Sequence, residues 1–138
     1  MAELRSVSPT VVAVLASAAA CDGVAAQAGA TLCRVAPREV LLIGDLDASI
    51  VVLDEPGAIV EDVTDGWAAF ELVGDDAADA FSRLSELELP EEGFAQGEVA
   101  RIGAKLLVGP GRLTILVPAM LGAFIEERIR TDCAEVLA

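Results

Sequence analysis

The chain has 138 residues, a formal net charge of −14 at pH 7 and no histidine. A surface this acidic repels phosphate backbones and anionic lipids, so the composition excludes nucleic acid and membrane surfaces as partners. The length suits one domain over residues 1–138. The mean hydropathy of +0.58 indicates either an apolar surface that serves another chain or a core rich in Ala and Val.

The first 30 residues are expected to form a helical N-terminal segment. Residues 1–8 carry no strong pattern and are interpreted as a loose end. Ser8 followed by Pro9 is typical of a helix N-terminus, because Ser caps the free N–H groups and Pro fits the first helical position. We therefore predict a helix over about residues 9–21 and a second short helical piece over residues 24–27.

Two strands are predicted next, from about Thr31 to Val35 and from Val40 to Gly44, with a turn between them that makes a hairpin. Residues 45–54 are ambiguous. Their short apolar run fits either a strand or one helical turn followed by a strand, since such runs do not decide the type of element.

The spacing of apolar residues changes in the centre of the chain, from that of strands to that of a helix. Two brief strands joined by a polar turn are predicted between Ile59 and Val73, and Gly74 ends the second. Asp75 and Asp76 follow, and acidic residues at this place favour the positive end of a helix, so we predict a helix after them.

Three apolar runs and a last helix complete the pattern. Strands are expected over residues 98–102 and 104–108 around Gly103, and over residues 112–117 after a Gly-Pro-Gly turn. Pro118 begins a helix whose apolar residues recur at spacings of three to five. This order of elements indicates an α+β domain with a mainly antiparallel sheet and helices packed on one face.

The residue types in this chain give little support for catalytic activity. Without histidine the chain has no imidazole base, and its three cysteines do not follow the spacing of a zinc site. Asp62 and Asp65 could share acid and base roles, but a turn stabilised by their own side chains is the plainer interpretation. We therefore predict no catalytic, cofactor-binding or metal-binding residue in this chain.

Four residues are better candidates for contact with a partner chain than for catalysis. Trp67 follows Gly66, where its ring either stacks on a ligand or partner or packs in the core. Phe124 lies in the last helix, and Arg34 and Arg38 flank Pro37 in a chain with only nine cations. Local ion pairs are the alternative role for the two arginines. Trp67, Phe124, Arg34 and Arg38 are the candidate partner contacts.

The cysteines also bear on the compartment. An odd number of them without CxxC spacing fits a reducing cytoplasm. The apolar run at residues 11–20 is shorter than the ~20 residues that a membrane-spanning helix needs. Small residues near Ala20 also resemble a cleavage site, so a signal peptide stays open as an alternative to the expected cytoplasmic location.

Six segments, taken in their order and spacing, resemble the gamma subunit of heterotetrameric sarcosine oxidase, in the wider group of folate-binding domains like the glycine-cleavage T-protein. The resemblance covers about residues 31–130. The segments are Val35-Ala-Pro-Arg-Glu-Val-Leu-Leu-Ile, Asp62-Val-Thr-Asp-Gly, Phe70-Glu-Leu-Val-Gly-Asp-Asp-Ala, Leu87-Glu-Leu-Pro, Phe94-Ala-Gln-Gly-Glu-Val-Ala-Arg-Ile and Leu113-Thr-Ile-Leu-Val-Pro.

This resemblance implies a folate-binding-like module that acts as a non-catalytic accessory subunit of a flavin-dependent oxidase for sarcosine or another N-methyl amino acid. The implied partners are larger alpha and beta flavoprotein subunits that hold FAD, FMN, NAD and tetrahydrofolate, with no cofactor in this chain. The chain departs from the family in its short segment before Thr31 and in lacking the family's folate-dependent aspartate motif. A related amine oxidase, a stand-alone tetrahydrofolate-binding protein and a structural homo-oligomer remain alternatives.

Overall fold

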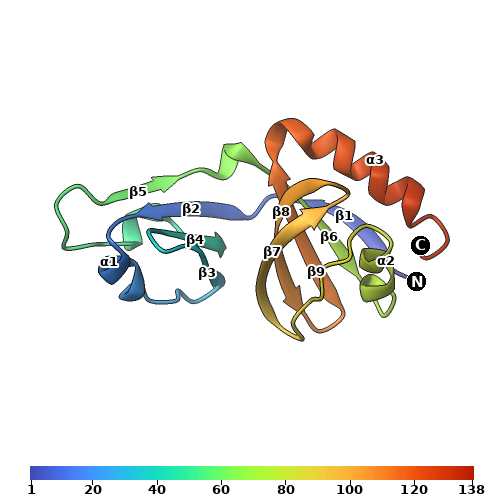
Figure 1. Ribbon diagram of the computed structural model, residues 1–138, viewed down its shortest axis with the longest axis horizontal. Coiled ribbons are helices and arrows are strands. Elements are labelled where there is room, and N and C mark those ends of the chain that lie inside the picture. The colour runs from blue at the N-terminus through green and yellow to red at the C-terminus, as the bar shows by residue number, and fades with distance from the viewer. The chain divides into compact units, whose positions relative to one another are not determined.

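The computed structural model describes residues 1–138 and divides into two compact units. One unit contains Met1–Ser8 and Asp65–Ala138, and the other contains Pro9–Thr64. Each unit is built on its own antiparallel sheet, which confirms the predicted α+β class with mainly antiparallel pairing (Figure 1). No helix has both the length and the apolar character needed to cross a membrane.

The larger unit has a five-stranded sheet in the order β1-β6-β9-β8-β7. Two α-helices and a 3-10 turn accompany it. The bounds of the strands are β1 Glu3–Val7, β6 Trp67–Val73, β7 Gly93–Val99, β8 Ile102–Gly109 and β9 Arg112–Pro118. The helical elements are α2 Ala77–Ser82, η3 Ala119–Leu121 and α3 Gly122–Asp132.

Alternate residues of this sheet form a core with the helices. Phe70 and Leu72 of β6 and Ile115 of β9 belong to the same buried cluster as Ile125 and Ile129 of α3. Burying each large aliphatic side chain contributes on the order of 1.5–3 kcal/mol. Both helices therefore pack on one face of the sheet, as predicted.

The smaller unit has a four-stranded sheet in the order β3-β4-β2-β5. The predicted hairpin is confirmed as β3 and β4. The ambiguous stretch contains a 3-10 turn and no strand, so the strand alternative is wrong, and the alternative of a helical turn followed by a strand is right only in its turn. The bounds are β2 Thr10–Leu15, α1 Ala18–Asp22, β3 Ala30–Ala36, β4 Glu39–Gly44, η1 Ala48–Ile50 and β5 Ile59–Asp62. The 3-10 turn η2, Thr64–Gly66, begins at the last residue of this unit.

The predicted helical N-terminus is wrong. Residues 3–7 form β1, which pairs with β6, and residues 10–15 form β2, which lies between β4 and β5. The run at 11–14 is rich in Val, whose branched side chain favours strands, and a strand buried on both faces shows no alternation. The only helix here is α1, which is capped where Ser17 Oγ accepts a hydrogen bond from Ala20 N at 3.1 Å.

Two other local predictions are corrected. The turn between β7 and β8 is Ala100–Arg101, both at positive φ (50° and 69°), and Gly103 lies inside β8 opposite Glu98. Asp76 makes no side-chain cap to α2. Its carboxylate instead lies 3.2 Å from the N-terminal ammonium of Met1.

Candidate interaction surface

Trp67 lines an open groove of about 370 Å³ in the larger unit. It begins β6 and lies opposite Pro118 at the end of β9. The groove is open because Gly103 brings no side chain to it, and a Cβ on Gly103 would meet nothing within 4 Å. Gly97 also lines the groove. The other lining residues are Gln96, Glu98, Ala104 and Lys105.

A hydrogen bond between side chains joins two strands at the polar edge of this groove. Lys105 Nζ donates to Gln96 Oε1 at 2.6 Å, which joins neighbouring strands β8 and β7 across the edge. A Cβ on Gly97 would lie 3.0 Å from a methyl carbon of Leu87, so a larger residue at this position would require the Leu87 side chain to shift. The result is an aromatic ring beside a flat, glycine-lined surface.

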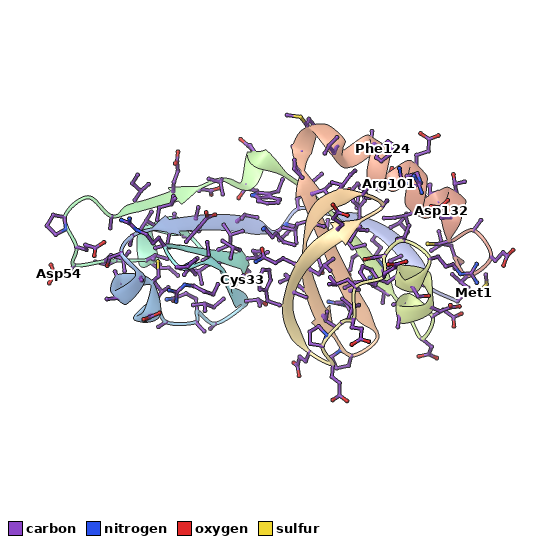
Figure 2. The ribbon with its side chains drawn as sticks, viewed as in Figure 1. Met1, Cys33, Asp54, Arg101, Phe124 and Asp132 are labelled. Atoms are coloured by element: carbon purple, nitrogen blue, oxygen red, sulfur yellow. The ribbon has the colours of Figure 1, made fainter.

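Apolar residues also project from the last helix. Met120 is 89% exposed and Phe124 is 47% exposed, and Figure 2 shows Phe124 on the outside of α3. The opposite side of the helix is buried through Ile125 and Ile129. Gly122 brings this side close to the sheet, because a Cβ there would lie 2.8 Å from that of Ala68.

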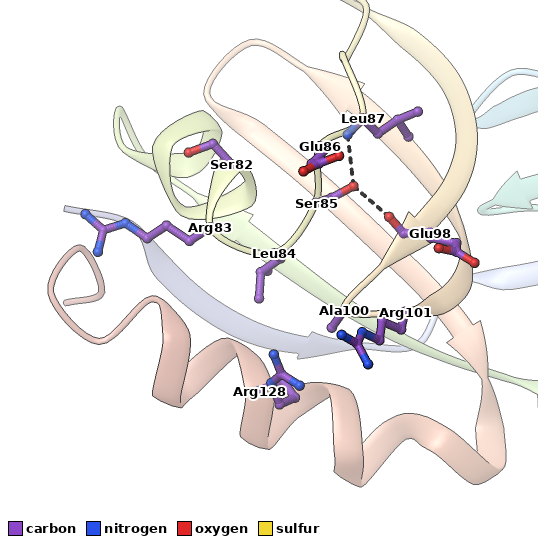
Figure 3. Close-up of a pocket in the computed structure, with 10 residues that line it drawn as sticks. All are labelled: Ser82, Arg83, Leu84, Ser85, Glu86, Leu87, Glu98, Ala100, Arg101 and Arg128. Atoms are coloured by element: carbon purple, nitrogen blue, oxygen red, sulfur yellow. Dashed lines mark hydrogen bonds between the residues drawn. The ribbon is translucent and has the colours of Figure 1, made fainter.

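A second groove, of about 880 Å³, lies beside α3 and contains three arginines, Arg83, Arg101 and Arg128 (Figure 3). Its walls are the segment after α2, the turn between β7 and β8, and α3. Arg101 reaches from the turn toward α3 and Arg128 reaches from α3 toward the turn, whereas Arg83 extends away from both. The remaining lining residues are Ser82, Leu84, Ser85, Glu86, Leu87, Glu98 and Ala100.

The arginines of this groove differ in their partners. Arg128 donates from Nε and Nη2 to one carboxylate oxygen of Asp132, at 3.1 and 2.8 Å. Arg83 lies 3.3 Å from Glu135 and 3.8 Å from Asp79. Arg101 has no carboxylate oxygen within 4.0 Å. We name Met120, Phe124, Arg128 and Arg101 the helix-edge surface.

Serine hydrogen bonds fix the wall opposite α3. Ser85 Oγ donates to the backbone oxygen of Glu98 at 2.6 Å and accepts from Leu87 N at 3.1 Å (Figure 3). The backbone N–H of Ala100 donates to Leu84 O at 2.8 Å. These bonds tie the segment after α2 to the end of β7, so the turn that carries Arg101 stands on a rigid support.

Arg34 and Arg38, the other two candidate contacts, lie in the smaller unit. The guanidinium of Arg34 lies 2.7 Å from Asp22 and also donates to backbone oxygens, including that of Pro37 at 2.6 Å. Arg38 Nε donates to Ala16 O at 3.5 Å. Both arginines thus brace the β3–β4 hairpin against neighbouring segments, and their role in partner contact stays a prediction.

The carboxylates of the central turn have structural roles. Thr64 N donates to Asp62 Oδ1 at 2.9 Å, and hydrogen bonds from Thr64 lower the pKa of Asp62. Thr64 Oγ1 in turn accepts from Val11 N at 2.9 Å. The plainer interpretation of this acidic turn, a turn stabilised by its own side chains, is therefore confirmed for Asp62.

The three cysteines are free and buried. Cys133 Sγ donates to Ala80 O at 3.2 Å, and burial raises the pKa of this thiol. No group of three or more Cys, Asp or Glu side chains is arranged to hold a metal ion.

The structure brings Phe124 together with Arg101 and Arg128 on the helix-edge surface, and it places Trp67 in a separate groove. Trp67 and Phe124 were both candidate contacts, but Arg101 and Arg128 were not. Large apolar residues recur at i,i+4 in two rows across η3 and α3, Met120 with Phe124 and Leu121 with Ile125 and Ile129. The two rows lie on different sides of the helix, so they cannot both face the sheet, and this was the available signal that one row is exposed.

No protein-family model matches this chain. Among curated proteins it is similar to a 4-hydroxy-2-oxovalerate aldolase of Thermomicrobium roseum, with 39% identity over 88 residues. That match covers 64% of this chain but only 24% of the aldolase, so the chain spans about a quarter of its relative's length.

Among solved structures the chain is similar to a chain of heterotetrameric sarcosine oxidase from Corynebacterium sp. U-96, solved with pyrrole 2-carboxylate. The TM-score is 0.82 at 18% identity, and the match covers 97% of this chain and 84% of that one. The chain therefore has the fold of a chain found in that enzyme.

Proposed function

We propose that this chain is a non-catalytic accessory subunit, of the gamma type, in a hetero-oligomeric flavin-dependent oxidase for sarcosine or another N-methyl amino acid. The observation that carries the proposal is the agreement in fold with a chain of heterotetrameric sarcosine oxidase over 97% of this chain. The six sequence segments that resemble the gamma subunit support the same assignment independently of the fold.

The surface supports a role in assembly. Stable interfaces are enriched in Met, aromatic residues and Arg, and the helix-edge surface combines these types. Both grooves are open surface features, which suit a protein contact better than the enclosed site of a small substrate. The acidic turn at Asp62, the one predicted alternative for acid–base chemistry, is used in local hydrogen bonds.

Under this proposal the redox chemistry belongs to the partners. Larger alpha- and beta-type subunits hold FAD, FMN, NAD and tetrahydrofolate, and this chain binds none of them. The assembly acts in the cytoplasm, oxidises the N-methyl group of the amino acid and transfers electrons through its flavins.

The test is purification from the native host under non-denaturing conditions, with the mass and the visible spectrum of the product. A larger yellow assembly that contains flavoprotein subunits is the expected result. A colourless product that contains only this chain, as a monomer or a homo-oligomer, would refute the proposal.

A stand-alone tetrahydrofolate-binding protein is a second candidate, favoured by Trp67 beside the glycine-lined groove. An aromatic side chain can stack on a planar pterin ring, and about 370 Å³ lies at the lower end of ligand-pocket volumes. The chain contains one tryptophan, so its fluorescence reports directly on this groove. Saturable quenching by tetrahydrofolate, abolished in Gly103→Leu, would favour this candidate, and unchanged fluorescence would eliminate it.

A further inference from the structure

We propose that the helix-edge surface is where a partner subunit binds, and that the partner segment carries one carboxylate next to an apolar side chain. The carboxylate pairs with Arg101 in the arginine groove, and the apolar side chain packs on Phe124 and Met120. This inference rests on the proposed function, because it names the contact that an accessory subunit would use.

The four residues form one surface. Phe124 and Arg128 are four residues apart on α3, so their side chains are neighbours on the same side of the helix. Met120 precedes Phe124 by the same spacing, across the junction of η3 and α3. Arg101 and Arg128 line the same groove and approach it from opposite walls (Figure 3).

The charges of the groove indicate which kind of partner segment can bind to this surface. Asp132 already neutralises Arg128, and Glu135 and Asp79 already neutralise Arg83. Glu86 and Glu98 also line the groove, but neither forms an ion pair with its arginines, so Arg101 is the groove's one cation without such a partner. A carboxylate from the partner supplies the ion pair that these two glutamates do not make, and the planar guanidinium offers it two parallel hydrogen bonds.

The turn that presents Arg101 is itself unusual. Ala100 and Arg101 both have positive φ, in a two-residue turn where Asn-Gly or Gly-Gly is favoured. L-residues are strained in this region, and such strain is concentrated at functional sites. Such strain is expected in a turn where the side chain of the arginine has a function.

A second copy of this chain is the less suitable occupant. Two copies each carry a net charge of −14, and their mutual repulsion opposes association. A strongly acidic partner is opposed for the same reason. The occupant is therefore a segment with one carboxylate on a partner surface that is otherwise neutral or basic.

The experiment compares variants of the full chain for binding to the purified partner subunits of the native complex. We expect Arg101→Glu and Phe124→Lys each to weaken binding about tenfold or more, because each places an unpaired charge in the contact. Arg130→Glu is the matched control. It makes the same change of charge at an exposed arginine of α3 that lies outside the helix-edge surface, and it should leave the affinity within about twofold. Circular dichroism verifies that each variant is folded.

Hydroxyl-radical footprinting adds a test without mutation. Met120 and Met1 are the only methionines, and they are 89% and 64% exposed. In the complex the oxidation of Met120 should fall several-fold relative to the isolated chain, while Met1, which pairs with Asp76 and lies outside the helix-edge surface, serves as the control.

The outcomes separate this inference from the proposed function. Failure to find any complex with flavoprotein subunits would refute the proposed function. A complex that forms but leaves Met120 fully reactive and tolerates Arg101→Glu would overturn the inference while the function stands. Protection of Met120 in the isolated chain, together with the mass of a dimer, would also overturn it, because the occupant would then be a second copy.

Discussion

The β7–β8 turn offers a sharp test of how this chain balances stability against contact. Ala100 and Arg101 both occupy the left-handed region, at φ 50° and 69°. Each L-residue there costs on the order of 1 kcal/mol. Asn-Gly is a favoured sequence for this type of turn, so the change relieves the strain. Gly makes the unfolded chain more flexible, which offsets roughly 0.5–1 kcal/mol of this stabilisation. The double change Ala100→Asn with Arg101→Gly should therefore stabilise the protein by about 1 kcal/mol.

The assay is thermal unfolding followed by circular dichroism. For a chain of this length 1 kcal/mol corresponds to a rise in Tm of about 4 °C. Arg101→Gln is the control, because it removes the charge but keeps the Cβ and the strain, so its Tm should match that of the wild type. A double variant that melts at or below the wild-type temperature would show that the turn is not strained. The same variant should bind the partner less well, since it lacks the Arg101 guanidinium.

Three further perturbations test the fold. Ile129→Ala should cost about 3–4 kcal/mol in denaturant unfolding, because Ile129 is fully buried in the core of the larger unit. Gly122→Ala should destabilise the protein by about 1–3 kcal/mol, since its Cβ would lie 2.8 Å from that of Ala68 and overpack the contact. Hydrogen bonds from the side chain and backbone of Ser17 lower the pKa of Glu55, so its contribution to stability is present above the unfolded pKa and is lost as the pH falls through the depressed folded pKa. The difference in unfolding free energy between wild type and Glu55→Gln should accordingly shrink on acidification, and a constant difference would refute this.

The sequence was most informative where turns and periodicity agreed. The β3–β4 hairpin, the strand before Gly74 and the helix after it were all predicted. In these places a Pro or Gly interrupts the apolar pattern, and the period on each side identifies the element. The helix over the sheet could also be predicted, because Ile125 and Ile129 recur at helical spacing.

The first 15 residues show why other elements could not be predicted. β1 has no distinctive residues, and it is a strand because β6 offers it a partner edge. β2 lies between two strands from later in the chain, and its residues 11–14 are all apolar and buried on both faces, so it lacks the alternation that identifies a strand. Both elements are decided by contacts between distant segments, which a local pattern does not contain.

The candidate surface was predictable only in its aromatic residues. Trp67 and Phe124 stand out by type, whereas Arg101 and Arg128 resemble any surface arginine until the fold places them in one groove. The turn at Ala100–Arg101 contains none of the residues that mark turns, so the break was assigned to the nearby Gly103. An arginine in a strained turn violates the local rule, and this violation is visible only in the backbone geometry.

The last helix shows how folding and contact can be separated within one element. Ile125 and Ile129 face the sheet and are fully buried, and Gly122 fixes how closely the helix approaches β6. Phe124 lies on the other side, so its ring adds little to this core and can be changed without creating a cavity. A substitution at Ile129 and one at Phe124 therefore act on different properties, the first on stability and the second on association. This division makes the variants of the helix-edge surface interpretable, because loss of binding in a fully folded Phe124→Lys chain can be assigned to the contact itself.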